Sequence, residues 1–486
     1  MTDLLQKLPA PPRPPNSAEP ATVARHVQSA RTIMEILFGP PAIRAFSVRY
    51  PDGSLESAGA PTPLFTLALK RAGSLSRMFW PPSERNVGEA YLRDDYDIEG
   101  NLEAAAGLAD LLIDRFSSPQ ILLQLALVMR TLPRNDHTAD DQTVTPEFQS
   151  SGLEVAAPTS LDGGHTTSGS AHSKARDAEV IRYHYDVGND FYALWLDARM
   201  VYSCAYFPEG TEDLDAAQEA KLEHLCRKLR LKPGEHLLDI GCGWGGLIIY
   251  AAQRYGVFAT GVTLSEAQAS LARERIRAAG LEDRVKVEVR DYRDLGLGEG
   301  EARYDKIVSV GMFEHVGRAN LQAYVQQVYR LLRPGGLFLN HGIVVVEAAV
   351  PPGAVEQLAR LVFRQKTFMH QYVFPDGELV YTHEVLAHAE RLGFETRDIE
   401  SLREHYAMTL RHWVKRLEDH HAEAVSSVGE TGYRVWRFYM GGCAWAFSTG
   451  RIGLSQMLFS KPGGRSSLPL SRADLYRPSP SAPEKR

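Results

Sequence analysis

A run of glycines preceded by one acidic residue is the part of the sequence best suited to binding a ligand. Residues 237–246 read LLDIGCGWGG, with Asp239 two positions before the first glycine, Gly241. Glycines let a backbone turn tightly at the carboxyl end of a strand, where open α/β sheets bind their ligands. The residue types therefore predict a binding loop for either a nucleotide phosphate or a methyl-donor sulfonium.

The identity of that ligand depends on the residues around the loop. The loop fits the spacing GxGxxG, but this pattern alone is weak evidence for a dinucleotide. The carboxylate of Asp239 would attract the ammonium end of S-adenosylmethionine and would repel a pyrophosphate. The next predicted strand ends in GVTL, without the acidic residue that binds an adenosine ribose in dinucleotide folds. Thr263 and Gln268 could contact that end of the donor, and Asp291 and Tyr292 an adenine. These residues favour S-adenosylmethionine over a dinucleotide or a purely structural turn.

The elements that must position this loop alternate between strand and helix. EHLLDIG, VFATGVT, RVKVEVRD, YDKIVSVG and GGLFLNHGIVVV predict strands, whereas GGLIIYAAQRYG and SEAQASLARERIRAAG predict helices. Ser265 opens the second helix, with Gln268 in the capping-box position. This alternation predicts an α/β fold with a mostly parallel sheet covered on both faces.

The length of the chain predicts more than one domain. It has 486 residues, of which 44% are hydrophobic and 23% charged, as in globular proteins. Residues 21–39 carry apolar side chains at helical spacing, and FSVRYPDGSLES followed by PLFTLALK predicts an antiparallel hairpin or small sheet. A long stretch rich in Ser, Thr, Gly and Asp predicts a flexible linker. The predicted division is a disordered 1–20, a smaller α+β domain at 21–134, a linker at 135–178, the larger domain at 179–465 and a disordered tail at 466–486.

Charge and cysteine content exclude several classes of protein. A net charge of −6 gives no general attraction to nucleic acid. The basic stretches at 221–232 and 410–416 are either local patches for an anionic surface or solvated helix faces. Four cysteines show no CxxC pair and no metal-ligand spacing, which predicts reduced thiols and no metal site. Neither a signal-peptide pattern nor an apolar run long enough to span a bilayer is evident, so we expect a cytoplasmic protein.

Several strings together resemble one family. YHYDVGNDFYALWLD, MVYSCAYFPEG, LLDIGCGWGG, GVTLSEAQ, DYRD, VGMFEHVG, LNHGI and EHYAMTL occur in the order and spacing of the cyclopropane-fatty-acyl-phospholipid synthases, which include the mycolic acid cyclopropane synthases. The resemblance covers about residues 181–461, and GEAYLRDDYDIEGNL is similar to the first domain of longer bacterial members. It implies a class I S-adenosylmethionine-dependent methyltransferase fold, Rossmann-like, with a mostly parallel seven-stranded sheet.

The resemblance also implies an activity and a set of site residues. Family members add a methylene from S-adenosylmethionine across a cis double bond of a phospholipid acyl chain, with bicarbonate as the base. Ten residues are expected to contact the donor: Tyr202, Ser203, Asp239, Gly241, Gly243, Thr263, Leu264, Gln268, Asp291 and Tyr292. Asp239 is included on its charge alone. The residues expected to cage the bicarbonate are Cys204, Glu314, His341, Ile343 and Tyr406.

The chemistry explains why such residues would be assembled. An alkene is a poor nucleophile, so the sulfonium methyl must be held in line with it in a dry pocket. A base must then remove a proton from the transferred methyl before the ring can close. A methyl- or methylene-branched product is the alternative within transferases. A lipid carrier without turnover and a nicotinamide oxidoreductase are the alternatives from other classes.

Substrate access raises further expectations. The acyl chain must come from a bilayer, so we expect peripheral contact with the inner face of the membrane. The N-terminal domain would contribute to lipid binding or to a homodimer. Trp436, Met440, Cys443 and Phe447 recur at helical spacing and predict either core packing or an acyl-chain contact, and HYDVGND is expected to lie over the donor.

Overall fold

The computed structural model describes residues 20–133, 136, 172–185, 187–296, 304–346, 368–374, 377–464 and 468–476. The chain divides into two compact units, Met1–Gln142 and Thr143–Arg486. Residues 1–19 of the predicted disordered N-terminus, most of the predicted linker and much of the predicted tail lie outside the described residues.

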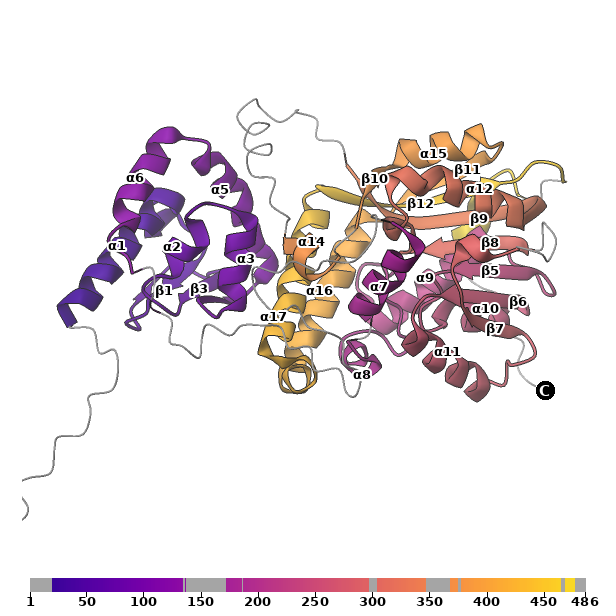
Figure 1. The fold of residues 1–486 in the computed structure, drawn as a ribbon, viewed down its shortest axis with the longest axis horizontal. Helices are drawn as coiled ribbons and strands as arrows, with labels where there is room; N and C mark the ends of the chain where they lie inside the picture. The colour runs from indigo at the N-terminus through magenta and orange to yellow at the C-terminus, as the bar shows by residue number, and fades with distance from the viewer. Residues whose placement is uncertain are drawn as a thin grey trace, which may run out of the picture. The chain divides into compact units, whose positions relative to one another are not determined.

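The N-terminal unit combines a small sheet with helices (Figure 1). The sheet has the order β2-β1-β3-β4. The predicted hairpin is confirmed, since β1 and β2 are antiparallel across the Pro-Asp-Gly turn. By contrast, β3 is parallel to β1, because the longer connection at 57–64 carries the chain past β1 rather than back along β2. The elements are α1 (Pro20–Phe38), η1 (Pro41–Ile43), β1 (Ser47–Arg49), β2 (Leu55–Glu56), β3 (Phe65–Leu69), α2 (Ser74–Phe79), α3 (Glu84–Leu92), β4 (Tyr96–Gly100), α4 (Leu102–Ala106), α5 (Leu108–Phe116) and α6 (Pro119–Met129).

Helices α5 and α6 leave apolar side chains on the surface of this unit. Leu123 and Leu127 of α6 are 64% and 58% exposed, and Ile113 of α5 is 48% exposed. Among the described residues, a membrane-spanning length and composition are met by no single helix, and only by one helix pair, Leu102–Phe116 with Pro119–Met129, which is bent by 106°.

The second unit is built on a mixed sheet with the order β11-β12-β9-β8-β5-β6-β7, and β10 pairs with β9 as an eighth strand. All neighbouring pairs are parallel except those made by β12, which is antiparallel to both β9 and β11. The prediction of a mostly parallel sheet is therefore confirmed. The strands are β5 (His236–Ile240), β6 (Phe258–Thr263), β7 (Val285–Val289), β8 (Tyr304–Val310), β9 (Leu332–Val345), β10 (Val380–Tyr381), β11 (Glu395–Ser401) and β12 (Ile452–Ser460).

Two hydrophobic layers cover the sheet, one on each face. Leu225, Ile248 and Ala272, from α9, α10 and α11, are fully buried in one layer, and Tyr324 and Val385, from α12 and α15, are fully buried in the other. Figure 1 shows α12 and α15 on the face opposite α10 and α11. The helices of these layers are α9 (Leu214–Lys228), α10 (Gly246–Tyr255), α11 (Glu266–Ala278), α12 (Leu321–Leu331) and α15 (Thr382–Arg391).

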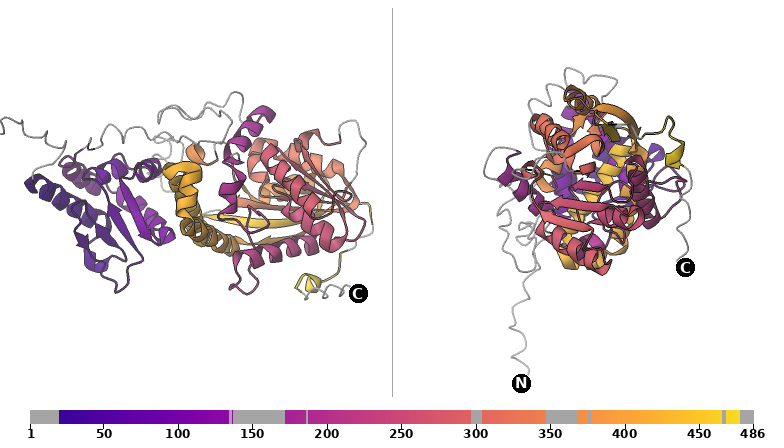
Figure 2. Two further views of the ribbon diagram at one scale, coloured as in Figure 1. Left: turned by 90° about the horizontal axis from the view of Figure 1, so that it is seen from below. Right: turned by 90° about the vertical axis from the view of Figure 1, so that its right-hand side faces the viewer.

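Two long helices lie side by side at one end of this sheet, as Figures 1 and 2 show. They are α16 (Arg403–Asp419) and α17 (His421–Ser448). Shorter elements complete the unit, namely α7 (Lys174–Tyr185), α8 (Asn189–Ala193), η3 (Tyr292–Asp294), η4 (Phe313–His315), η5 (Arg318–Asn320), α14 (Phe368–Tyr372) and α18 (Ala473–Tyr476).

Two predicted boundaries are wrong. Helix α7 begins at Lys174, inside the predicted linker, and α18 lies inside the predicted disordered tail. Specific contacts order both segments: Asp177 of α7 pairs with Arg293 at 2.9 Å, and in α18 Leu475 is 4% exposed. The composition of a whole segment does not reveal a single ion pair or a single buried side chain. It therefore cannot locate the boundary between an ordered helix and a predicted linker or tail.

Candidate active site

The glycine loop joins β5 to α10 and borders a cavity of the second unit. Gly241 has a φ of 86°, which favours glycine, and a Cβ there would lie 2.7 Å from the Cβ of Met312. The amides of Gly241 and Cys242 both donate to the carbonyl of Val262 on β6, at 2.9 and 3.0 Å. The loop is thus fixed against the neighbouring strand, with its open side towards the cavity.

All of the residues predicted to contact the donor line this cavity. It contains about 1110 Å³ of atom-free space, including its open mouth. The predicted residues that line it are Tyr202, Ser203, Asp239, Gly241, Gly243, Thr263, Leu264, Gln268, Asp291 and Tyr292. Residues from β5, β6, the turn after β7 and the segment before α9 therefore converge at one edge of the sheet.

Asp239 and Lys221, two buried residues of opposite charge, both line the cavity. Asp239 is 2% exposed, and its Oδ1 has no hydrogen-bond partner within the described part of the chain. Burial raises the pKa of Asp239 to about 7, and Lys221 opposes this shift. Lys221 is itself buried and donates from Nζ to Oγ of Ser203 at 3.0 Å, and burial lowers its pKa to about 8. A carboxylate and an ammonium in one buried site match the ammonium and carboxylate of an amino-acid group such as the methionine end of S-adenosylmethionine.

The sequence does not identify Lys221 as a site residue, because the basic stretch 221–232 predicts either a local patch or a solvated helix face. That interpretation is wrong for Lys221 and Lys228, both 1% exposed. The helical spacing of α9 carries the missed signal, since Leu214, Ala217 and Leu225 are buried on the face that also holds these lysines. Lys228 pairs with Glu400, so only Lys221 of the two lines the cavity.

The capping box predicted for α11 is half formed. Ser265 Oγ accepts from the amide of Gln268 at 3.3 Å, as predicted. The reciprocal bond is replaced, because Gln268 Oε1 accepts from the hydroxyl of Thr263 at 2.7 Å, and Thr263 Oγ1 accepts from the amide of Ser265 at 3.2 Å. The cap therefore holds two predicted donor-binding side chains in place at the end of β6.

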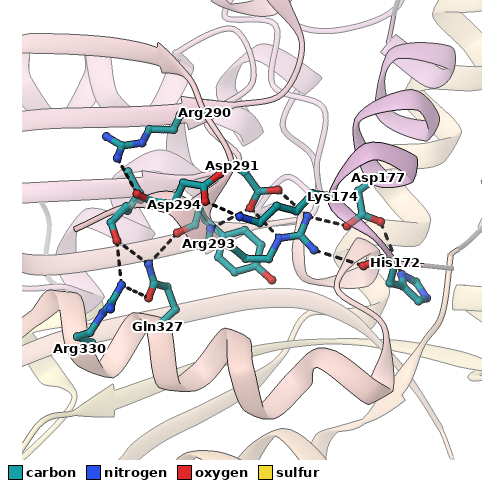
Figure 3. Close-up of polar contacts among 11 residues, drawn as sticks. His172, Lys174, Asp177, Arg290, Asp291, Arg293, Asp294, Gln327 and Arg330 are labelled. Carbon is teal, nitrogen blue, oxygen red and sulfur yellow. Dashed lines mark hydrogen bonds and ion pairs between the residues drawn. The ribbon is translucent and has the colours of Figure 1, made fainter. Parts of the chain in front are cut away.

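Arg293 organises the other rim of the cavity (Figure 3). It donates to Asp291 from its backbone amide at 2.9 Å, from Nε at 2.8 Å and from Nη2 at 2.5 Å. Nη2 also donates to Asp177 of α7 at 2.9 Å, and Lys174 pairs with Asp294. Asp291, predicted to accept from an adenine, is thus oriented by Arg293 but keeps spare lone pairs.

Segment α7–α8 adjoins the donor cavity. Asp177 and Ile181 of α7 line it, and Asn189 at the start of α8 accepts from Nε1 of Trp244 in the glycine loop at 2.7 Å. Within HYDVGND, predicted to lie over the donor, Asn189 therefore contacts the loop that lines the cavity.

The predicted base-holding residues are not among those that line the cavity, and all of them are buried except Ile343, which is half-buried. Ser203 lines the cavity and Cys204 follows it inside, while Met312 and His315 line it on either side of Glu314. The exposed fractions are 0% for Cys204 and 9% for Glu314. The residues come from the segment before α9, from η4, β9 and α16: Cys204, Glu314, His341, Ile343 and Tyr406.

Glu314 and Ile343 contact each other directly. The backbone amide of Ile343 donates to Glu314 Oε1 at 2.7 Å. Ile343, expected to be part of the bicarbonate cage, therefore orients the carboxyl group of Glu314 through its amide. Glu314 Oε2 is buried and lacks a partner among the residues that the structure places. Burial raises the pKa of Glu314 to about 7, so a protonated Oε2–H is available near neutral pH.

His341 and Tyr406 are also buried, and both side chains are neutral. Burial lowers the pKa of His341 well below its usual value, and its Nε2 has no partner in the described ranges. Burial raises the pKa of Tyr406 well above its usual value, and neighbouring Cys204 and Glu314 add to this effect. Buried polar atoms without partners fit a small anion that would accept from them.

Aromatic rings separate this group from solvent. The ring of Tyr202 lies 5.4 Å from Trp195 and 5.2 Å from Trp413, and Phe447 lies 4.6 Å from Tyr406. Trp436, Met440 and Phe447 of α17 are 3%, 0% and 1% exposed, as expected for core packing, and Cys443 is partly buried. Such surroundings exclude water and strengthen electrostatic interactions.

Comparison with known proteins shows the family of this chain. The family model described as mycolic acid cyclopropane synthetase matches residues 172–457. A probable fatty acid methyltransferase of Pseudomonas putida is 39% identical over 447 residues, which cover 90% of this chain and 99% of the relative. The cyclopropane-fatty-acyl-phospholipid synthase of Escherichia coli K12 is 38% identical over 291 residues, which cover 60% of this chain and 69% of the relative.

Solved structures give the same result for the second unit. A cyclopropane synthase of Mycobacterium tuberculosis superposes with a TM-score of 0.53 at 32% identity, over 58% of this chain and 98% of that one. A mycolic acid cyclopropane synthase in complex with SAH and CTAB gives the same values. The chain therefore belongs to the mycolic acid cyclopropane synthetase family, as an S-adenosylmethionine-dependent lipid methyltransferase with a class I fold.

Proposed function

We propose that the enzyme transfers a methylene from S-adenosylmethionine to the cis double bond of unsaturated acyl chains in membrane phospholipids, giving a cyclopropane. The observation that carries this proposal is that Glu314, His341 and Tyr406 are buried next to residues that line the donor cavity. Met312 and His315 flank Glu314, Val310 pairs with His341 across two strands, and Tyr406 neighbours Tyr202. Ring closure on an alkene requires removal of a proton from the transferred methyl group, so it needs a proton acceptor held close to the donor.

The chain's own residues would hold and orient the donor. S-adenosylmethionine, when bound, supplies an electrophilic methyl group. Asp239 would hold its ammonium and Lys221 its carboxylate, each through a charge-assisted hydrogen bond in a buried site. Thr263, Gln268 and Asp291 lie where the nucleoside end would rest. Such fixation supplies the proximity that a weakly nucleophilic alkene requires.

The buried group would hold the base. Bicarbonate, when bound, supplies a proton acceptor small enough to reach a methyl hydrogen. Glu314 Oε2 and His341 Nε2 are the buried polar atoms, unpartnered among the described residues, that fit such an anion, and Tyr406 and Cys204 line the same region. The amide of Ile343 fixes Glu314 and leaves its second oxygen for the anion. The aromatic rings around Tyr202 and Tyr406 would keep water from capturing the cationic carbon.

A second candidate product is a methyl- or methylene-branched acyl chain. The similarity to a probable fatty acid methyltransferase over almost the whole chain favours it. The two candidates differ in how the cationic intermediate is resolved, and a methylene branch also requires proton loss. The buried proton-accepting group is therefore needed for the ring and for the methylene branch.

We also propose that the N-terminal unit contacts the membrane, at the inner face in a cytoplasmic enzyme. Leu123 and Leu127 are four residues apart and share one exposed face of α6, and the residues of α6 carry no charge. An uncharged apolar face suits the headgroup boundary of a bilayer. Leu123→Glu with Leu127→Glu should reduce co-sedimentation with phospholipid vesicles, while Leu55→Glu, on exposed β2, should not. A concentration-dependent change in mass that the double variant abolishes, with vesicle binding unchanged, would instead make this face a homodimer contact.

The experiment that tests the proposed reaction uses vesicles of cis-monounsaturated phospholipid. We expect release of S-adenosylhomocysteine that depends on the double bond, with saturated vesicles as the control. Proton NMR of the extracted lipid should show ring protons at unusually high field. Branched-chain signals without ring protons would favour the second candidate, and no S-adenosylhomocysteine with either lipid would refute turnover on phospholipids.

A further inference from the structure

Gln456 contacts the predicted base-holding histidine from a neighbouring strand. Its Nε2 lies 3.1 Å from His341 Nδ1, and the two residues are directly paired in the antiparallel register of β12 and β9. Gln456 and His341 are 0% and 1% exposed. Paired residues on adjacent strands project to the same face, so this contact is fixed by the register of the sheet.

The chemistry of the two groups determines which atom carries the hydrogen. An amide nitrogen can only donate, so Nδ1 of His341 must accept. The imidazole is neutral, because burial and the cationic Lys221 and Lys228 on α9 lower its pKa far below its usual value. A neutral ring has one N–H, and with Nδ1 accepting, that hydrogen lies on Nε2.

The tautomer of His341 decides whether Nε2 can donate a hydrogen bond to an anion. Nε2 is buried and lacks a partner within the described residues, whereas Nδ1 is occupied by Gln456. The opposite tautomer would present a lone pair at Nε2 and would repel an anion beside it. The tautomer held by Gln456 presents an N–H, which an anionic oxygen can accept.

We propose that Gln456 is a positioning residue that holds His341 with its hydrogen on Nε2, so that His341 donates to the anion rather than acting as the base. This inference deepens the proposed function and rests on it for the identity of the anion. It assigns proton removal to the anion itself and leaves His341 to fix one of its oxygens.

Nitrogen NMR of protein labelled with ¹⁵N in histidine tests the tautomer without donor or lipid. The His341 signals are assigned by their loss in His341→Gln. We expect wild type to show a protonated Nε2 and an unprotonated Nδ1, Gln456→Leu to show a mixture, and Gln456→Glu to move the hydrogen to Nδ1. Met457→Leu is the matched control, since Met457 is fully buried on the opposite face of β12, and it should leave the His341 signals unchanged.

The outcomes separate this inference from the proposed reaction. A wild-type Nδ1–H signal, as expected if the amide is rotated, would overturn the inference, and so would a tautomer that neither Gln456 variant changes. Sodium bicarbonate should shift the wild-type Nε2 signal more than sodium chloride does, and equal shifts would overturn the anion contact. If the proposed reaction fails while these signals behave as expected, only the substrate assignment is lost. In variants that fold, turnover should fall with the affinity for S-adenosylmethionine unchanged.

Discussion

The buried carboxyl group of Glu314 should make the stability of the enzyme depend on pH in a specific window. Its pKa is about 7 in the folded protein, because burial disfavours the charged form, against an ordinary 4.5. Between these two values the folded protein keeps a proton that the unfolded chain has released. The contribution of Glu314 to the free energy of unfolding is therefore fully present below pH 4.5. It decreases as pH rises to about 7 and stays low at higher pH.

The size of the effect follows from that difference. At 1.36 kcal/mol for each pH unit between the two values, the loss is about 3 kcal/mol. Glu314→Gln cannot ionise and keeps an oxygen to accept from the Ile343 amide. The free energy of unfolding of the variant, relative to wild type, should thus rise by about 3 kcal/mol between pH 4.5 and 7 and then remain level.

Urea unfolding followed by tryptophan fluorescence provides the assay. Of the six tryptophans, only Trp80 lies in the N-terminal unit, so the signal reports mainly the catalytic unit. Glu423→Gln, an exposed position on α17, is the control and should show no such slope. If the free energies of unfolding of wild type and Glu314→Gln change in parallel from pH 4.5 to 7, the argument that Glu314 is protonated in the folded enzyme is refuted.

Three further predictions concern the donor cavity and its surroundings. Lys221→Met should weaken binding of S-adenosylmethionine at least about tenfold in isothermal titration, since a hydrogen bond to a charged group contributes roughly 1.5–3 kcal/mol. Lys232→Met, at an exposed position, is the control and should leave the affinity unchanged. Equal affinities of the two variants would contradict a contact between Lys221 and the donor carboxylate. Gly342→Ala should lower the unfolding free energy by about 1–3 kcal/mol, because the added Cβ would lie 2.2 Å from Cδ1 of Phe313. Gly442→Ala, with open space around the added Cβ, is the control and should be neutral or stabilising. A neutral Gly342→Ala would contradict the expected clash with Phe313. Arg293→Met should speed proteolysis within α7, since it removes the pair that fixes this helix, and unchanged cleavage would show that other contacts hold it.

Much of the fold could be predicted because its elements carry local signals. The strands that became β5 to β9 follow from Val- and Ile-rich runs, and α10 and α11 from helical spacing. Strand order and direction carry no local signal. Nothing in the residues of β12, IGLSQMLFS, shows that it runs antiparallel to both of its neighbours. The parallel pairing of β1 with β3 depends on the path of a connection.

The site shows the same limit at the level of single residues. Asp239 and the glycine loop could be identified because their residue types suit a cationic donor at a strand end. Lys221 was missed because a basic stretch usually faces solvent, and only its place on the apolar face of α9 reveals its burial. Gln456 lies 115 residues from His341, and their contact exists only through the register of β12 on β9. The residues around Glu314 were predicted by resemblance, since their types have no distinctive spacing in the chain.

The central claim is that one group of residues binds the donor and a separate group holds the anion that removes the proton. The most direct test measures both in the same variants, Glu314→Gln and His341→Gln. Affinity for S-adenosylmethionine is measured by titration calorimetry, and turnover by release of S-adenosylhomocysteine with cis-unsaturated vesicles. We expect affinities within about threefold of wild type and turnover reduced by about 100-fold or more, the range of a lost acid–base contribution. An equal loss of affinity and turnover in both variants would contradict the claim.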